Sequence, residues 1–205
     1  TIVFEGNRYS LSPASELEGT YSYEGDDLTI ASGNTYGLEF TYQGELATAE
    51  TTVPFPPEET QISQSEISVP QILTRRDLLQ IRDSFSETID VTWNNDEGEY
   101  YYVLIENLEE NPEAIDVNNS LPRQFSYVSE PTQENIFSLR LFVHYQQYGL
   151  HRARLFRVNE EYANLYESLE QDSRNLNEPF SNVRNGLGIF TGFAYNEVYF
   201  EVKKR

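Results

Sequence analysis

The sequence predicts an all-β protein: two antiparallel β-sandwich modules, immunoglobulin- or fibronectin III-like, with one helix inserted in the second. Aromatic residues make up 14% of the 205 residues, and Tyr and Phe suit a pleated, half-buried surface. Short runs of alternating apolar and polar residues end repeatedly at Gly, Asn or Asp turns, which is typical of strands and hairpins. A hydrophobic content of 38% is normal for antiparallel sheets with one wet face.

The first module is predicted over residues 1–53. The stretch Thr35–Tyr42 alternates, so that Tyr36, Leu38, Phe40 and Tyr42 fall on one face of a strand. Residues 45–53 continue extended after a Gln-Gly turn. Shorter extended pieces are expected at 1–5, 8–11, 19–23 and 28–31. Together these strands predict a small antiparallel sandwich.

Residues 54–73 are predicted to be a proline-rich linker. Three prolines among residues 54–57 cannot join a central ladder and favour polyproline II. A rigid connector and a proline-rich recognition motif are the two interpretations, and the position between two modules favours the connector.

The second module is predicted over residues 74–205. Residues 88–93 form an alternating strand that directs Trp93 into the core, and Tyr100–Asn107 is its return strand across an acidic turn. This pair resembles the early strands of a fibronectin type III domain. Residues 74–83 are expected as a short helical turn or loop. Further strands are expected at 125–128, 136–145, 150–158, 189–195 and 198–203. Residues 146–149 are expected to form the turn between the strands at 136–145 and 150–158.

One helix is predicted at 160–173. Asn159 is a suitable N-cap, and Glu160 and Glu161 complement the positive end of the helix dipole. A helical stripe follows, made of Tyr162, Leu165, Tyr166 and Leu169.

The charge of the chain restricts its partners. The formal net charge is −20, and residues 1–72 hold 12 acidic side chains and one basic one. Nucleic acid is therefore not expected as a partner, because phosphate binding needs Lys and Arg. An anionic membrane surface is disfavoured for the same reason. A soluble, self-repelling surface is the simplest interpretation, with a cation or a basic partner as the alternative. The chain has no Cys, which excludes disulfides and Cys-based metal sites or nucleophiles.

The C-terminal segment carries the most specific pattern. It contains Pro179, Asn182, Gly186, Gly188 and Phe190, the last four within NVRNGLGIF. This segment resembles the end of the domain of unknown function 4249 family, a family of uncharacterised Bacteroidetes cell-envelope lipoproteins. A Gly-x-x-Tyr-x-Leu strand from residue 33 and an Ala-x-Thr connector at 47–57 are also similar to that family.

The resemblance implies an outer-membrane lipoprotein, periplasmic or surface-exposed, often encoded beside a TonB-dependent outer-membrane receptor. The expected partner is such a receptor or another envelope protein. The resemblance also implies that membrane contact is made only through a lipid anchor, which is absent from this chain. Because the chain begins at Thr1, we expect a signal peptide, a lipidated Cys and up to two strands upstream. The resemblance implies no catalytic residues.

Two kinds of binding residue are predicted. Tyr100, Tyr102, Tyr145 and Tyr148 could form an aromatic patch that stacks on a sugar or peptide, with core packing as the competing interpretation. The acidic turns supply Asp26 and Asp27, and Asp96 and Glu97, as oxygen ligands for calcium, although neither turn matches a twelve-residue calcium loop. No other cofactor is expected.

Other polar groups are assigned structural roles. Gly186 and Gly188 are interpreted as a hinge rather than a phosphate-binding loop. His144 and His151 are placed on facing arms of a hairpin, where a metal would need a third ligand. Arg152, Arg154 and Arg157 either pair with local carboxylates or dock an acidic partner.

The leading functional hypothesis is a non-enzymatic accessory or binding subunit for an outer-membrane receptor. A stand-alone carbohydrate- or peptide-binding module is the alternative. A hydrolase ranks third, because it needs a cleft with convergent titratable groups.

Overall fold

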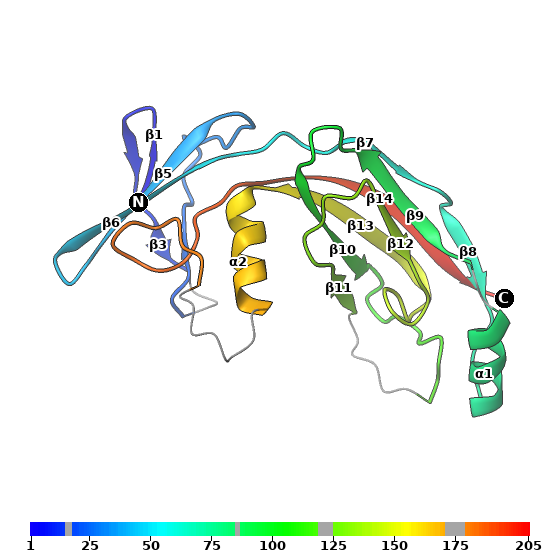
Figure 1. Ribbon diagram of the computed structural model, residues 1–205. Coiled ribbons are helices and arrows are strands. Elements are labelled where there is room, and N and C mark those ends of the chain that lie inside the picture. The colour runs from blue at the N-terminus through cyan, green and yellow to red at the C-terminus, as the bar shows by residue number, and fades with distance from the viewer. Residues whose placement is uncertain (15–17, 85–86, 119–124, 171–178) are drawn as a thin grey trace. The chain divides into compact units, whose positions relative to one another are not determined.

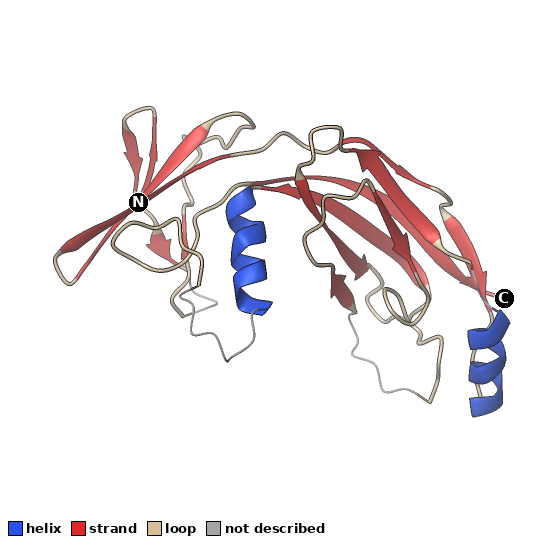
Figure 2. Cartoon of the chain, in the orientation of Figure 1, coloured by secondary structure: helices blue, strands red, loops and turns tan. Residues whose placement is uncertain are grey.

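The computed structural model describes residues 1–14, 18–84, 87–118, 125–170 and 179–205. These residues form strands arranged in several sheets, together with two helices, so the mainly β class is confirmed (Figure 2). Within the described residues, no helix has both the length and the apolarity needed to span a membrane.

The chain forms two compact units. Unit 1 comprises Thr1–Phe55 and Val158–Ala194, and unit 2 comprises Pro56–Arg157 and Tyr195–Arg205. The grouping differs from the predicted ranges, because the helix expected in the second module belongs with the N-terminal residues. The chain thus leaves unit 1, builds most of unit 2, returns, and ends in unit 2.

Unit 1 is built on a four-stranded sheet in the order β2-β1-β5-β6. Its strands are β1 (Ile2–Phe4), β2 (Asn7–Tyr9), β5 (Thr35–Tyr42) and β6 (Glu45–Thr52), and β3 (Ser12–Pro13) pairs with β4 (Tyr21–Ser22). Tyr36 is buried and stacks on Phe4 at 4.6 Å between ring centroids. The strand expected at 28–31 does not form. Instead, the Tyr36 hydroxyl donates to Thr29 O and accepts from Ala31 N, which ties that segment down without a ladder.

Helix α2 (Glu160–Glu170) also belongs to unit 1, and the rest of the predicted helix, 171–173, lies outside the described residues. Asn159 precedes the helix as expected, but its amide donates to Thr51 Oγ1 at 2.9 Å and to Thr52 O at 2.8 Å. This side chain therefore fastens the start of the helix to β6. Ala163 is buried, so the helix packs closely against its unit.

Unit 2 has two sheets (Figure 1). Side chains from both sheets contribute to one buried cluster. The five-stranded sheet has the order β11 (Ser126–Val128), β10 (Tyr100–Asn107), β13 (Gly149–Val158), β14 (Phe193–Lys204), β8 (Glu66–Val69). The three-stranded sheet has the order β12 (Ile136–Leu139), β9 (Ile89–Asn94), β7 (Glu58–Ile62). Trp93 is buried as predicted and lies 5.4 Å from the Tyr101 ring.

The segment expected as a linker contains two strands. β7 pairs with β9, and β8 pairs in parallel with β14, with Ile67 opposite Val202. Ile67 and Val69 are buried in the core of unit 2. This parallel pair also departs from the purely antiparallel prediction.

The prediction of one long strand at 136–145 was wrong, because β12 ends at Leu139. The chain then turns: His144 N donates to Arg140 O at 3.0 Å, and Phe142 adopts a φ of 65°. β12 pairs with β9 rather than with β13, so the hairpin predicted around 146–149 does not form. In place of the two final strands expected at 189–195 and 198–203, one continuous strand forms, β14, and residues 189–192 lie outside it.

Helix α1 (Arg75–Ser84) forms where a short helical turn or loop was expected. Asp77 Oδ2 accepts from Thr74 N at 2.8 Å, and Asp77 N donates to Thr74 Oγ1 at 3.3 Å. This reciprocal pair is a capping box with Asp in the third position, and it satisfies donors at the helix start. Ile81 joins the buried cluster of unit 2, and Leu78 packs against it.

Candidate binding face

The outer face of the five-stranded sheet in unit 2 carries a continuous set of polar and aromatic side chains. Along β10 and β13, the odd-numbered residues from Tyr101 to Asn107 and from His151 to Leu155 are buried, and the even-numbered ones face outward. On β14 the odd-numbered residues Tyr195, Glu197 and Tyr199 are exposed. Alternation along a strand therefore separates a core face from an accessible face.

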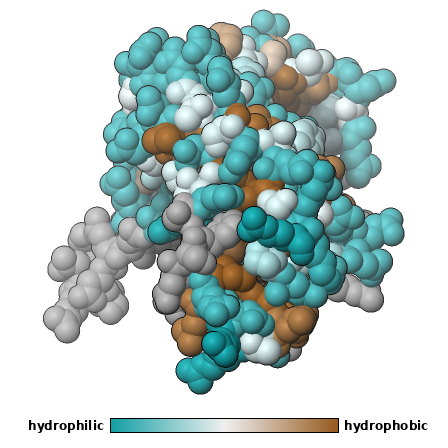
Figure 3. All heavy atoms as spheres, turned by 90° about the vertical axis from the view of Figure 1, so that its right-hand side faces the viewer, coloured by the Kyte–Doolittle hydropathy of each residue, from teal (hydrophilic) through white to brown (hydrophobic). Residues whose placement is uncertain are grey.

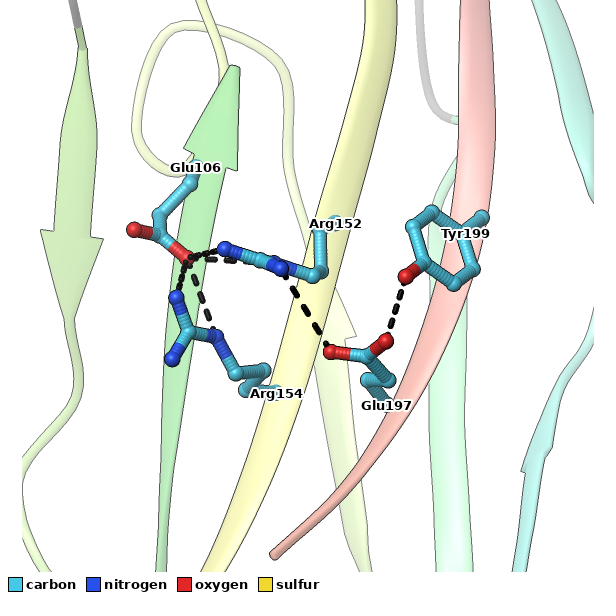
Figure 4. Close-up of polar contacts among 5 residues, drawn as sticks. All are labelled: Glu106, Arg152, Arg154, Glu197 and Tyr199. Carbon is cyan, nitrogen blue, oxygen red and sulfur yellow. Dashed lines mark hydrogen bonds and ion pairs between the residues drawn. The ribbon is translucent and has the colours of Figure 1, made fainter. Parts of the chain in front are cut away.

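Two arginines of β13 converge on a single carboxylate oxygen of β10 (Figure 4). Glu106 Oε2 accepts from Arg154 Nη2 at 2.6 Å and Nε at 3.1 Å, and from Arg152 Nη2 at 3.1 Å. Arg152 Nη1 also lies 3.6 Å from Glu197 Oε2 on β14. The three strands are thereby linked on this face by charge-assisted contacts.

Tyr199 extends this network along β14. Its hydroxyl donates to Glu197, and that hydrogen bond raises the Tyr199 pKa above its ordinary value (Figure 4). The arginine and glutamate side chains are about a quarter to a third exposed. Each such ion pair contributes only about 0–1 kcal/mol to folding. Their main effect is to hold the two guanidinium groups in fixed positions.

Aromatic rings lie beside the arginines. Tyr102 stacks on Phe156 at 4.7 Å with 9° between the ring planes, and Phe156 lies 5.3 Å from Tyr195. The Arg154 guanidinium carbon is 5.7 Å from the Tyr195 ring centroid, within cation–π range. Tyr195 and Tyr199 remain 48% and 41% exposed. Partly exposed rings on a sheet, next to oriented guanidinium groups, can stack on and hydrogen-bond to a ligand or protein partner.

The four predicted aromatic residues do not form one patch. Tyr100 and Tyr102 lie on the outer face, whereas Tyr145 and Tyr148 are buried. The Tyr148 hydroxyl donates to Val69 O at 3.1 Å, and burial raises its pKa to about 12. Tyr145 contacts the Phe200 ring at 5.7 Å in the core, where burial also raises its pKa. Core packing, the competing interpretation, therefore describes the second pair.

The acidic turn after β9 already has a positively charged side chain beside it, that of Arg157. Asp96 and Glu97 line a hollow of about 190 Å³, together with Glu99 and Arg157. Arg157 Nη2 lies 2.6 Å from Glu99 Oε1 and 3.6 Å from Glu97 Oε2. The guanidinium group thus stands where a calcium ion would gain its attraction to these carboxylates.

The other acidic turn belongs to unit 1. Asp27 accepts a hydrogen bond from the Tyr23 hydroxyl, which raises the Tyr23 pKa to about 12, and Asp26 lies beside it in the chain. Within the described residues, no group of three or more His, Cys, Asp or Glu side chains is arranged to hold a metal ion.

The glycine motif closes a loop that lies along β6. Asn182 donates from Nδ2 to Phe190 O at 2.8 Å and accepts from Phe190 N at 2.8 Å. Gly188 has a φ of 119°, and a Cβ on Gly186 would lie 2.9 Å from Val183. Arg184 forms a bridge with Thr48. These contacts hold the motif as a closed loop, the interpretation of the two glycines as a hinge stays a prediction, and Pro179 lies exposed before the loop.

A second hollow, of about 570 Å³, lies on the polar face of the unit 1 sheet. Gly37 lies among its lining residues, and Glu50, Thr48 and Arg184 are among the polar groups around it. Glu39, also at its wall, is held by two hydrogen bonds from Arg8.

The two histidines lie in separate environments. His144 Nδ1 accepts from Arg140 N at 2.8 Å, and its ring contacts Tyr127 at 4.5 Å. His151 stacks on Phe200 at 4.9 Å, its Nδ1 donates to Gly149 O at 3.0 Å, and its Nε2 accepts from Asn107. Burial lowers the pKa of each to about 4. Both are neutral core residues at neutral pH.

Sequence reasoning missed several residues of the outer face. Of the two interpretations of the three arginines, pairing with carboxylates of the chain is observed: Arg152 and Arg154 pair with Glu106, and Arg157 pairs with Glu99. Tyr195, Glu197 and Tyr199 were not selected, although their spacing of two within a strand carried the signal.

The sequence model of a domain of unknown function, DUF4249, matches residues 1–198. No curated protein matches the chain significantly.

Proposed function

The chain belongs to the DUF4249 family, and we propose that it is a non-enzymatic cell-envelope lipoprotein, acting as an accessory or binding subunit of an outer-membrane receptor. The envelope location and the receptor partner follow from the resemblance noted in the C-terminal segment. The binding role is supported by the outer face of unit 2.

One observation carries the binding role: Tyr195 and Tyr199 are partly exposed beside arginines whose orientation is already fixed. Tyr and Arg are enriched among residues that dominate binding energies at interfaces. Rigid side chains lose little conformational entropy on binding. The charges of Arg152 and Arg154 are also balanced by Glu106 and Glu197, which reduces the cost of removing them from water.

The proposal is tested by purifying the tagged, lipidated full-length protein from detergent-solubilised outer membrane of its native host. We expect a receptor at near-stoichiometric amounts with the wild type. Replacing Tyr195 and Tyr199 by Ser should reduce its amount by about tenfold or more, as for central interface residues. Tyr42→Ser is the matched control, because Tyr42 is 68% exposed but lies in unit 1.

Three results would contradict the proposal in different ways. Recovery of the wild-type protein in the soluble cytosolic fraction would refute the proposed envelope location. Purification of the protein alone would remove the accessory role. An undiminished receptor signal with the Tyr195 and Tyr199 variants would remove the outer face as the binding surface.

The alternative is a stand-alone carbohydrate- or peptide-binding module with an immunoglobulin- or fibronectin III-like sandwich and structural calcium. The shared core of the two sheets in unit 2, with Trp93 inside, supports the sandwich. The stacked Tyr102 and Phe156 rings support ligand stacking. This function predicts that a glycan or peptide raises the unfolding temperature of the isolated protein, because the ligand binds only the native state.

A further inference from the structure

Helix α1 has a core side and an exposed side. Leu78 and Ile81 face the core of unit 2. Arg75 and Arg76 lie four and three positions before Leu79, so these three side chains share the other side of the helix. Both arginines are exposed, and Leu79 is 51% exposed.

Two further apolar side chains adjoin the start of this helix. Leu73 is 59% exposed and Val117 is 50% exposed. The segments that carry them are tied together, because Val117 N donates to Ile72 O at 3.2 Å and Asn118 Nδ2 donates to Leu73 O at 3.1 Å. We call the set Leu73, Arg75, Arg76, Leu79 and Val117 the α1 surface.

The α1 surface carries two arginines and borders one carboxylate, Asp77. Asp77 is folded back onto Thr74; the hydrogen bonds from Thr74 and Leu73 lower its pKa, and the charge of Arg76 lowers it further. Arg75 and Arg76 form no ion pair with any described residue, whereas Arg152, Arg154 and Arg157 are all paired. A basic, apolar surface is thus present on a chain with a net charge of −20.

We infer that the α1 surface rests on an anionic lipid surface. Amphipathic helices that lie at a lipid interface combine Lys or Arg side chains with apolar ones such as Leu, and the α1 surface offers both kinds. Helix α1 projects beyond the strands of unit 2 (Figure 1), and neither of the two hollows described above includes α1 residues. In the space-filling view from this side, apolar atoms lie among hydrophilic ones at the lower end, where α1 lies (Figure 3). A projecting surface suits a flat, deformable lipid layer better than a preformed protein pocket.

The net charge of the chain opposes this contact only at long range. At physiological ionic strength, charges more than about 8 Å apart are largely screened. The arginines nearest the lipid therefore determine the interaction, and each strengthens binding to an anionic bilayer by about fivefold. The inference depends on α1 alone and is independent of the proposed receptor partner.

The test is co-sedimentation of the full chain with vesicles at 50 mM salt. We expect binding to vesicles of phosphatidylcholine with 30% phosphatidylglycerol, little binding to pure phosphatidylcholine, and release at 300 mM salt. The double variant Arg75→Gln, Arg76→Gln should bind roughly 25-fold more weakly. Leu79→Ser should also weaken binding. The unfolding temperature of each variant, unchanged from wild type, shows that the fold is intact.

Two matched controls lie in unit 1. Arg8→Gln with Arg184→Gln removes the same formal charge, and Leu46→Ser replaces a leucine that is 50% exposed. Both should bind vesicles like the wild type. The inference is overturned if the wild type does not sediment with anionic vesicles, if it binds both vesicle types equally, or if the controls lose as much binding as the α1 variants. It is also overturned if the α1 variants lose a protein partner while vesicle binding is unchanged.

Discussion

Lowering the pH should unfold unit 2 through its two buried histidines. His151 is fully buried and His144 is 3% exposed, and burial lowers the pKa of each from 6.5 to about 4. In the folded state His151 Nε2 accepts from Asn107, and His144 Nδ1 accepts from Arg140 N. Protonation of either nitrogen would abolish that hydrogen bond and place a charge in the core.

The direction of this pH effect follows from whether the folded or the unfolded chain binds the protons. Between about pH 6.5 and pH 4 the unfolded chain takes up a proton at each histidine, and the folded chain does not. The free energy of unfolding therefore falls as the pH is lowered through this range, and these groups add no further loss below it. Each histidine accounts for about 3 kcal/mol, and the two together for about 6 kcal/mol, a large part of a typical domain stability.

The neighbouring charges do not reverse this direction. Arg140 lowers the pKa of His144 further, and Glu109 raises that of His151, but burial is the largest effect for both. Glu113, whose pKa is lowered by its hydrogen bond from Lys204, loses that stabilisation only as the pH falls below its ordinary range of about 4.5. The loss of stability from Glu113 therefore occurs at lower pH than the loss from the two histidines.

Urea unfolding followed by the fluorescence of Trp93, the only tryptophan, measures the effect at each pH. With both histidines, the free energy of unfolding should change by up to about 2.7 kcal/mol per pH unit. His151→Leu should roughly halve this slope. Leu155→Ala, a core variant on the same strand, should lower the stability and keep the slope. A stability that stays constant from pH 7 to pH 5, or a full slope in His151→Leu, would refute the reasoning.

Three other predictions follow from single side chains. Tyr145→Phe should leave the urea midpoint unchanged or raise stability by up to about 1 kcal/mol, because the buried Tyr145 hydroxyl has no hydrogen-bond partner among the described residues; a loss above 1 kcal/mol would show that the hydroxyl is satisfied. Arg157→Gln should release more heat than the wild type on titration with millimolar calcium, because Glu97 and Glu99 lose their counter-charge; equal heats would argue against a latent site there. Gly188→Ala should lower stability by about 1–2 kcal/mol in thermal unfolding, since its φ of 119° strains any other residue; an unchanged midpoint would mean that the loop rearranges without cost.

The strands that the sequence predicts well are those whose pattern is local. Ile89–Asn94 alternates apolar and polar residues, Tyr100–Asn107 consists mainly of aromatic and aliphatic residues, and each has every second side chain buried. Residues 136–145 alternate in the same way, yet the chain turns at Phe142. A positive φ at a phenylalanine leaves no trace in a hydropathy pattern. It is imposed by contacts such as the His144 hydrogen bond to Arg140 N, which sequence alone does not specify.

Strand pairing is the part that the sequence could not supply. β8 has only four residues and follows a proline-rich, polar stretch, so its own pattern is weak. It becomes a strand because Ile67 lies opposite Val202, more than a hundred residues later. Such pairings depend on the core that forms around them, and their local sequence carries little of that information.

The candidate binding face shows the same division between local and non-local information. Alternation places Arg152 and Arg154 on one side of a strand, and a period of two places Tyr195, Glu197 and Tyr199 on one side of another. What alternation does not reveal is that β13 lies between β10 and β14. Only that order brings Glu106 to both arginines and lets Arg152 reach Glu197. The side chains of the face were therefore recognisable in the sequence one strand at a time, and the candidate binding face forms only when three strands far apart in the sequence become neighbours.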